Sequence, residues 1–214
     1  MNIFIQGAGR GIGLAFAKHA LTSRQDDNWH MFLTARSPKD SEGYKELPPS
    51  AKITWIAMDY LEPDSITKAG IAVAEKVDQL DRVISVAGVL RDPKVSPEKR
   101  IADLDSAAML YAYQINAMGP VLLGKALWPL IKGDHPTIFA SLSARVGSIS
   151  DNRLGGWYAY RASKAAQNQL LRTMSIELAR YNPHACVATL HPGTVDTALS
   201  KPFQAHVPAN KLFT

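Results

Sequence analysis

The feature that most constrains the fold is a regular alternation of short apolar runs with longer helical segments. The runs are rich in β-branched and aromatic residues, and their nearly continuous apolar character is typical of strands buried on both faces. Six strands are predicted, at Asn2–Gln6, His30–Ala35, Ile53–Met58, Arg82–Val86, Thr137–Leu142 and Ala185–His191. Helices are predicted near Gly11–Ser23, Asp64–Asp78, Asp105–Ile131 and Trp157–Tyr181. The alternation predicts an α/β protein in which a doubly wound parallel sheet lies between helices on both faces, joined by right-handed crossovers.

The predicted elements follow one another without an interdomain linker, an internal repeat or a low-complexity segment. Residues Ser37–Ser50 are polar and contain three prolines, so a loop or a single turn is expected there in place of a helix. The segment Lys201–Thr214 is expected to be irregular. A single domain over residues 1–214, built as a three-layer αβα arrangement, is predicted.

Composition excludes several functional classes. The net charge is +5, but the basic residues are scattered and form no basic–aromatic stripe, so no nucleic-acid partner is predicted. No apolar run is long enough to span a bilayer, and the N-terminus has no basic region of a signal peptide, so no membrane partner is expected. The single cysteine, Cys186, excludes an internal disulfide and a cysteine-based metal site. A cytoplasmic location is therefore expected.

A glycine-rich turn follows the first predicted strand and opens the first helix. It reads Gly7-Ala8-Gly9-Arg10-Gly11-Ile12-Gly13, with the spacing Gly-x-x-x-Gly-x-Gly. Glycine permits the unusual dihedrals of a tight turn and a close approach of backbone to phosphates, and the helix N-terminus presents free N–H groups to an anion. A flexible turn would explain the glycines alone. Their position between strand and helix favours a Rossmann-type fold that binds a dinucleotide.

Two arginines indicate which dinucleotide is bound. NAD sites usually carry an acidic residue after the second strand, where it binds the ribose 2′-hydroxyl, whereas NADP sites need a cation for the 2′-phosphate. Here the second predicted strand is followed by Arg36, and Arg10 lies within the glycine turn. Either arginine alone would be interpreted as an ordinary surface residue. Together they favour NADP(H), because a guanidinium makes bidentate contacts with phosphate.

Tyr160 and Lys164 stand one turn apart near the start of the last predicted helix. A tyrosine with an ordinary pKa near ~10 is a poor acid–base group at neutral pH, and a neighbouring ammonium would stabilise its phenolate. The spacing occurs by chance in many helices, where it is a surface pair. The pair therefore gains its meaning from the other motifs of the chain.

From Ile3 to about Leu199, the sequence resembles the short-chain dehydrogenase/reductase family. The resemblance rests on motifs in the family's order: Gly7-x-x-x-Gly11-x-Gly13, Asp59, Ala87-Gly88, Asn116, a serine at the end of the fifth strand, Tyr160-x-x-x-Lys164 and Pro192-Gly193. The runs Ser143–Ser148 and Trp157–Lys164 resemble the C-factor-like and sniffer-like carbonyl reductase branch. In this family a final strand and helix usually follow the point where this chain ends.

The resemblance implies catalytic roles for four residues. Tyr160 would exchange a proton with the carbonyl or alcohol oxygen of a small-molecule substrate. Lys164 would hold the nicotinamide ribose and lower the pKa of Tyr160. Asn116 would support a water that links Lys164 to solvent, although it could also be a polar residue that breaks the helix near Gly119-Pro120.

The fourth role, orienting the substrate carbonyl, belongs to a serine. Related sequences often carry a Ser-Ser pair, whereas this chain has Ser143 followed by Ala144. Ser143 is favoured over Ser141 or Ser148, because a hydroxyl is needed where the strand opens onto the cofactor.

The resemblance also implies a set of residues around the cofactor. Asp59 would accept a hydrogen bond from the adenine amino group, and Ala87-Gly88 would let the cofactor lie close to the backbone. The full predicted set is Gly7, Gly9, Arg10, Gly11, Ile12, Gly13, Arg36, Asp59, Tyr60, Ala87, Gly88, Tyr160, Lys164, Pro192, Gly193, Thr194, Val195 and Thr197. No metal is expected. A homodimer or homotetramer formed through the two long helices is implied by the resemblance alone.

Two departures from the family pattern accompany these matches. Gln6 stands where threonine is common, which alters the hydrogen bonding and helix packing at the turn, and Ser85-Val86 replaces an Asn-Asn pair that stabilises the central sheet. Neither departure removes a residue to which the resemblance assigns a catalytic role. A second function remains open, because a signalling role has been attributed to the C-factor branch: a dinucleotide-binding regulatory protein with little or no turnover.

Overall fold

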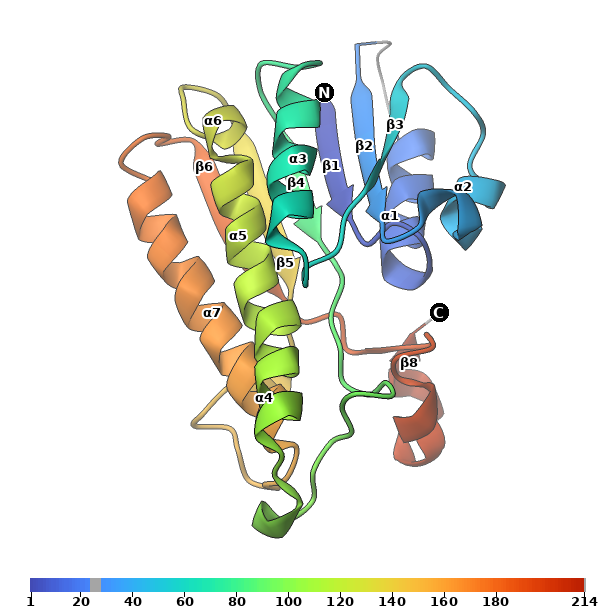
Figure 1. The fold of residues 1–214 in the computed structure, drawn as a ribbon, viewed down its shortest axis with the longest axis vertical. Coiled ribbons are helices and arrows are strands. Elements are labelled where there is room, and N and C mark those ends of the chain that lie inside the picture. Colours follow the sequence, from blue (N-terminus) through green and yellow to red (C-terminus); the bar gives the residue numbers. More distant parts are fainter. Residues whose placement is uncertain (24–27, 214) are drawn as a thin grey trace.

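A six-stranded parallel sheet forms the centre of the protein in the computed structural model, which describes residues 1–23 and 28–213 (Figure 1). The strands lie in the order β3-β2-β1-β4-β5-β6. Their bounds are β1 (Asn2–Gln6), β2 (His30–Ala35), β3 (Ile53–Ala57), β4 (Arg82–Ser85), β5 (Thr137–Leu142) and β6 (Ala185–Leu190). Strands β2 and β3 are added to one side of β1, and strands β4 to β6 are added to its other side. The carboxyl ends of β1 and β4 therefore border a crevice, which is where ligands bind in such sheets.

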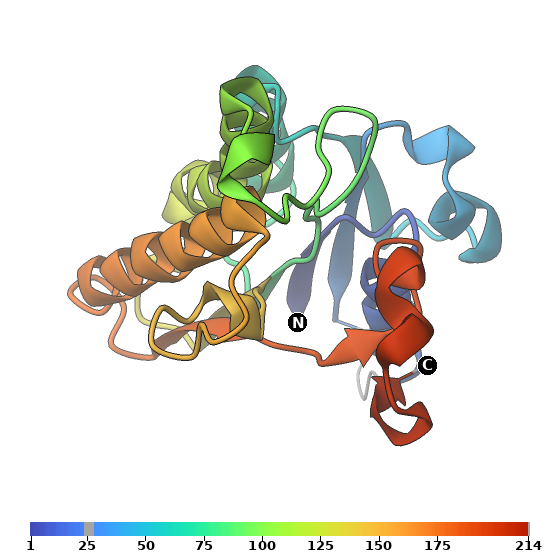
Figure 2. The same ribbon diagram turned by 90° about the horizontal axis from the view of Figure 1, so that it is seen from below.

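Helices cover both faces of the sheet, which confirms the predicted Rossmann-type, three-layer arrangement. One face carries α3 (Pro63–Ala74), α4 (Ser106–Tyr113), α5 (Gly119–Ala126), α6 (Trp128–Ile131) and α7 (Tyr158–Leu178). The other carries α1 (Gly11–Thr22) and the short α2 (Glu42–Glu46), as the views in Figures 1 and 2 show. Within the described residues, no helix has the length and apolarity needed to cross a membrane.

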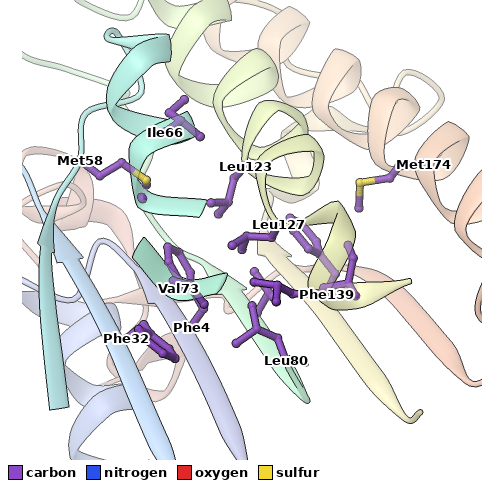
Figure 3. Close-up of a cluster of buried hydrophobic side chains, with 14 of the residues drawn as sticks. Phe4, Phe32, Met58, Ile66, Val73, Leu80, Leu123, Leu127, Phe139 and Met174 are labelled. Atoms are coloured by element: carbon purple, nitrogen blue, oxygen red, sulfur yellow. The ribbon is translucent and has the colours of Figure 1, made fainter. Parts of the chain in front are cut away.

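The main hydrophobic core lies between the sheet and the layer formed by α3, α5 and α7. Phe4, Phe32 and Phe139 project into it from β1, β2 and β5 and are fully buried (Figure 3). Leu123 of α5 and Leu127, which directly follows that helix, belong to the same cluster. A smaller core on the opposite face lies beneath α1. Cys186, although part of an apolar run, is exposed, because it lies on edge strand β6 beyond the cover of α1.

The long helix predicted over Asp105–Ile131 is divided in the structure. A π-helical turn, Gln114–Met118, separates α4 from α5, and α6 follows as a separate short helix. Proline lacks an N–H group and is tolerated in the first turn of a helix, and Pro120 lies in the first turn of α5. The π-helical turn contains Asn116, and such turns often occur at functional sites.

The segment predicted as a loop or a single turn and the C-terminal segment predicted as irregular both contain short elements. A 3₁₀ turn, Pro38–Asp40, and α2 occupy the proline-rich loop, where the Ser41 hydroxyl accepts a hydrogen bond from the N–H of Tyr44 and caps α2. Near the C-terminus, β8 (Leu212–Phe213) pairs in parallel with β7 (Thr194–Val195). Strands of two residues are too short to leave a periodic pattern in the sequence.

Candidate active site

The glycine-rich turn connects β1 to α1 at the crevice, and its geometry requires glycine. Gly7 and Gly11 have φ values of +82° and +55°, in the left-handed region that side chains disfavour. At Gly13, a Cβ atom would lie 2.1 Å from the carbonyl oxygen of Gly7. The first turn of α1 therefore packs directly against the end of β1, with its free N–H groups at the crevice.

Segments far apart in the sequence meet at this turn. A Cβ atom on Gly7 would lie 3.1 Å from the backbone nitrogen of Ala87, and one on Gly11 would lie 3.6 Å from Cγ2 of Thr197. The structure therefore brings together three of the predicted cofactor-binding segments. Gln6, which departs from the family pattern, accepts hydrogen bonds at Oε1 from the N–H groups of Val86 and Ala87. Its side chain thus ties the end of β1 to the backbone that follows β4.

The predicted adenosine end of the site lies beside the turn. Arg10 and Arg36 are both exposed, and Gly9 packs against Ala35, so the backbone that carries the two arginines converges at the ends of β1 and β2. Asp59 accepts a hydrogen bond from the N–H of Leu61. The side chain of Tyr60 instead packs in the main core with its hydroxyl 2.8 Å from that of Ser85, and burial raises its pKa.

The segment after β6 carries the predicted nicotinamide-side residues. Gly193 has a φ of +75°; Pro192 precedes it in the connection after β6, and Thr194 and Val195 follow it as β7. A Cβ atom on Gly193 would lie 2.6 Å from the ring of Phe213, so the pairing of β7 with β8 also depends on this glycine.

Tyr160 and Lys164 lie in the first two turns of α7 and share one face. The Lys164 Nζ atom lies 5.8 Å from the centre of the Tyr160 ring. It donates hydrogen bonds of 2.9 Å to the carbonyl oxygen of Leu142, at the end of β5, and to Oε1 of Gln167. A Cβ atom on Gly88 would lie 3.5 Å from Nζ, so the backbone after β4 passes directly beside the ammonium.

Asn116 completes this cluster and is fully buried. Its Oδ1 atom accepts from the N–H of Val89, and its Nδ2 atom donates to the carbonyl oxygen of Val89 and to the hydroxyl of Ser163. The side chain thus fastens the π-helical turn both to the strand-end backbone and to α7. Asn116 lies in the π-helical turn between α4 and α5, and its Oδ1 atom and Lys164 Nζ both border Gly88. Its role in a proton relay stays a prediction.

Burial shifts the pKa values of Tyr160 and Lys164 in opposite directions. It raises the pKa of Tyr160 to about 12 and lowers the pKa of Lys164 to about 7. Both shifts have the same cause, because a poorly solvated site disfavours the charged form of either group. In the protein chain alone, burial therefore raises the pKa of Tyr160, and the lowering expected from Lys164 is not seen.

The three candidate serines have different environments. Ser143, at the end of β5, donates a hydrogen bond of 2.7 Å to Oδ1 of Asn168. Ser141 is buried, and its hydroxyl accepts from Nε2 of Gln167. Ser148 is paired with the hydroxyl of Ser150 in an exposed loop. The role of Ser143 in orienting a carbonyl stays a prediction.

A buried glutamate that the sequence did not single out holds the start of α7. Glu98 is 6% exposed, and its carboxylate accepts from the N–H of Ala159, while its carbonyl oxygen accepts from the N–H of Trp157. A carboxylate is stabilised at a helix N-terminus. Trp157 has a φ of +54°, and its ring lies between those of Tyr160 and Phe203. The contact fixes the entry into the helix that carries Tyr160.

Within the described residues, no group of three histidine, cysteine, aspartate or glutamate side chains is arranged to hold a metal ion. The described residues at the crevice supply the phenol of Tyr160, the buried amino group of Lys164, amides and hydroxyls, beside a turn suited to phosphates.

Comparisons with known proteins agree with this arrangement. The family model described as short chain dehydrogenase matches residues 1–208. The C-signal protein of Myxococcus xanthus is 39% identical over 110 residues, which cover 51% of this chain and 64% of that protein. The NADPH-bound carbonyl reductase from chicken fatty liver has a TM-score of 0.83 at 28% identity, with 100% of this chain and 85% of that chain covered. The carbonyl reductase Sniffer of D. melanogaster has a TM-score of 0.80 at 27% identity, with 92% and 82% covered. The resemblance predicted from the motifs is confirmed.

Proposed function

Because the chain belongs to the short-chain dehydrogenase family, we propose that it is an NADPH-dependent oxidoreductase that interconverts a carbonyl compound and an alcohol. The observation that carries this proposal is the convergence of Lys164 and Asn116 on the backbone at Gly88, one strand away from the glycine turn, with the Tyr160 ring beside Lys164. A protein that only bound a dinucleotide would have no need for a partly buried phenol and a buried ammonium beside the nicotinamide end.

The residues at the crevice fit NADPH. Positions 7, 13 and 88 lack side chains where a Cβ atom would crowd the backbone or the Lys164–Asn116 cluster. In the proposed complex, the glycine turn and Ile12 hold the pyrophosphate, with Thr197 beside it. Asp59 and Tyr60 border the adenine, the latter through its backbone, and Pro192, Gly193, Thr194 and Val195 border the nicotinamide.

NADPH supplies the hydride, and the protein supplies the proton. Tyr160 donates its phenolic proton to the carbonyl oxygen during reduction and accepts one from the alcohol in the reverse direction. Its high pKa keeps it protonated at neutral pH, as a proton donor must be. Lys164 holds the nicotinamide ribose and, when charged, stabilises the phenolate that remains. Ser143 orients the carbonyl, and Asn116 supports a water that returns a proton through Lys164.

The proposed function is tested by measuring NADPH oxidation with the purified protein against a panel of aldehydes, ketones and quinones. Turnover with at least one substrate, absent from protein-free controls, is expected. Tight binding of NADPH with no turnover across the panel would instead favour the second function, a regulatory or signalling protein. The partial similarity to C-signal is the observation that keeps this second function in view.

Replacing Arg36 with aspartate is expected to raise the KM for NADPH by about 10- to 100-fold while changing the KM for NADH only a few-fold. The reason is that a charge-assisted hydrogen bond to the 2′-phosphate is lost and a like charge takes its place. Steady-state kinetics with both cofactors measure the effect. The control Lys68→Asp makes the same change in net charge at an exposed position of α3. It should change the KM values for NADPH and NADH little. Equal losses with NADPH and NADH in Arg36→Asp would contradict the assignment of the 2′-phosphate site.

A further inference from the structure

Lys164 has a buried partner, Gln167, that the proposed mechanism has not used. Gln167 lies one turn further along α7 and is 1% exposed. Its Oε1 atom accepts a 2.9 Å hydrogen bond from Lys164 Nζ. Its Nε2 atom donates to the hydroxyl of Ser141 at 2.7 Å and to the carbonyl oxygen of Leu142 at 3.2 Å. An amide buried this deeply, with every polar atom bonded, fixes the position of whatever it contacts.

The orientation of this amide follows from its partners. An ammonium has three donors and no acceptor, so only the oxygen of Gln167 can face Lys164. The carbonyl oxygen of Leu142 only accepts, so the nitrogen must face it. That oxygen has two lone pairs, and Lys164 and Gln167 both donate to it. The result is a closed network in which two of the three donors of the ammonium are bound to β5 and α7.

We propose that Gln167 is a positioning residue for Lys164, whose amide oxygen supports the charged form of the ammonium and fixes the place of Nζ beside Gly88. The third donor of Lys164 is then directed to the nicotinamide ribose. The consequence for catalysis rests on the proposed function, whereas the consequence for the titration of Lys164 does not.

The groups around Nζ make this contact important for its charge. β5 presents Ser141 and Leu142, the π-helical turn presents Asn116, the backbone after β4 presents Gly88, and α7 itself presents Tyr160 and Gln167. Of these, only Tyr160 titrates. Burial is the cause that lowers the pKa of Lys164 to about 7, with no charged side chain of the described residues contributing. Neutral acceptors are therefore what stabilises the ammonium against desolvation, and Gln167 supplies one of two.

Two substitutions test the proposal in opposite directions. Gln167→Leu removes the acceptor at similar volume and should lower the pKa of Lys164 by about one unit, since hydrogen bonding favours the charged form. Gln167→Glu places a carboxylate beside Nζ and should raise the pKa by about one unit or more. The same two changes at Gln169, which is exposed on the same helix, serve as matched controls and should leave the titration unchanged.

The first readout is the pH dependence of the free energy of unfolding, which needs no activity. Lys164 binds its proton more weakly in the folded state, so stability should rise with pH from about the folded pKa up to the unfolded value of about 10.4. The contribution of Lys164 is isolated by subtracting the curve of the matching protein that also carries Lys164→Met. We expect the start of this rise to move down in Gln167→Leu and up in Gln167→Glu. No movement, or movement of both in the same direction, would overturn the proposal.

The second readout is the pH profile of carbonyl reduction. If the charged ammonium is the active form, the alkaline limb of kcat should move to lower pH in Gln167→Leu and to higher pH in Gln167→Glu. A uniform loss of kcat with an unchanged profile would show a purely structural role for Gln167 and contradict the proposal. A wild-type protein without turnover would count against the proposed function alone, because the stability titration still reports on Gln167.

Discussion

Replacing Tyr160 with phenylalanine is expected to reduce carbonyl reduction by about 10²- to 10⁴-fold, the range that positioned proton transfer contributes. The substitution removes only the hydroxyl. The ring keeps its contacts with Trp157, at 6.3 Å between ring centres, and with the Lys164 ammonium. Binding of NADPH should therefore change little, because the cofactor contacts proposed for the turn and for Lys164 remain. Single-turnover reduction and fluorescence titration with NADPH separate these two effects.

A matched control is available two residues earlier on the same helix. Tyr158 is 39% exposed, and Tyr158→Phe makes the same chemical change outside the proposed site. Its turnover should stay close to that of the wild type. If the turnover of Tyr160→Phe equals that of the wild type for each substrate that the wild type accepts, another group delivers the proton.

The strands of the fold could be predicted nearly to the residue, for a physical reason. Parallel strands buried on both faces are continuous apolar runs, and each run here ends at a polar or glycine-containing turn. β1, β2 and β5 match the predicted bounds, and β3, β4 and β6 each end one residue early. The helix over Asp105–Ile131 was predicted as one element, and a break near Gly119-Pro120 entered only as an alternative reading of Asn116. Gly119-Pro120 can sit inside a helical pattern, and only tertiary packing decides that the chain forms a π-helical turn at Asn116.

The residues of the candidate site divide in the same way. The glycine positions were predictable because glycine itself marks a close approach of backbone. The Tyr160–Lys164 pair was predictable because a spacing of four residues places two side chains on one face of a helix. Glu98 and Gln167 were not predicted, although both are buried and both contact the first turns of α7. A polar side chain is expected to be exposed unless its partners are known. The partners of Gln167 include Ser141, which is distant in sequence and meets it only after β5 and α7 have packed.

The other large effect is expected at the glycine turn, where Gly13→Ala should destabilise the fold and abolish tight binding of NADPH. Alanine inside a helix normally stabilises by about 0.5–1 kcal/mol relative to glycine. Here, however, the added Cβ atom would lie 2.1 Å from the carbonyl oxygen of Gly7 and 2.7 Å from its carbon, and both are backbone atoms that cannot rotate away. Relief requires α1 to move from the end of β1, at a cost of about 1–3 kcal/mol or more, and that movement displaces the N–H groups proposed to bind the pyrophosphate.

Thermal unfolding and fluorescence titration with NADPH measure the two parts of this prediction. A loss of about 2–4 °C in Tm is expected for each kcal/mol in a chain of this size. Gly155→Ala is the matched control, because Gly155 has a φ of +65° but no atom within 4 Å of an added Cβ, so it reports the strain of a left-handed alanine without a collision. We expect the control to lose stability by about 1–2 kcal/mol and to bind NADPH normally. Normal NADPH binding by Gly13→Ala would mean that the first turn of α1 does not hold the cofactor, and the dinucleotide site would have to be sought elsewhere in the crevice.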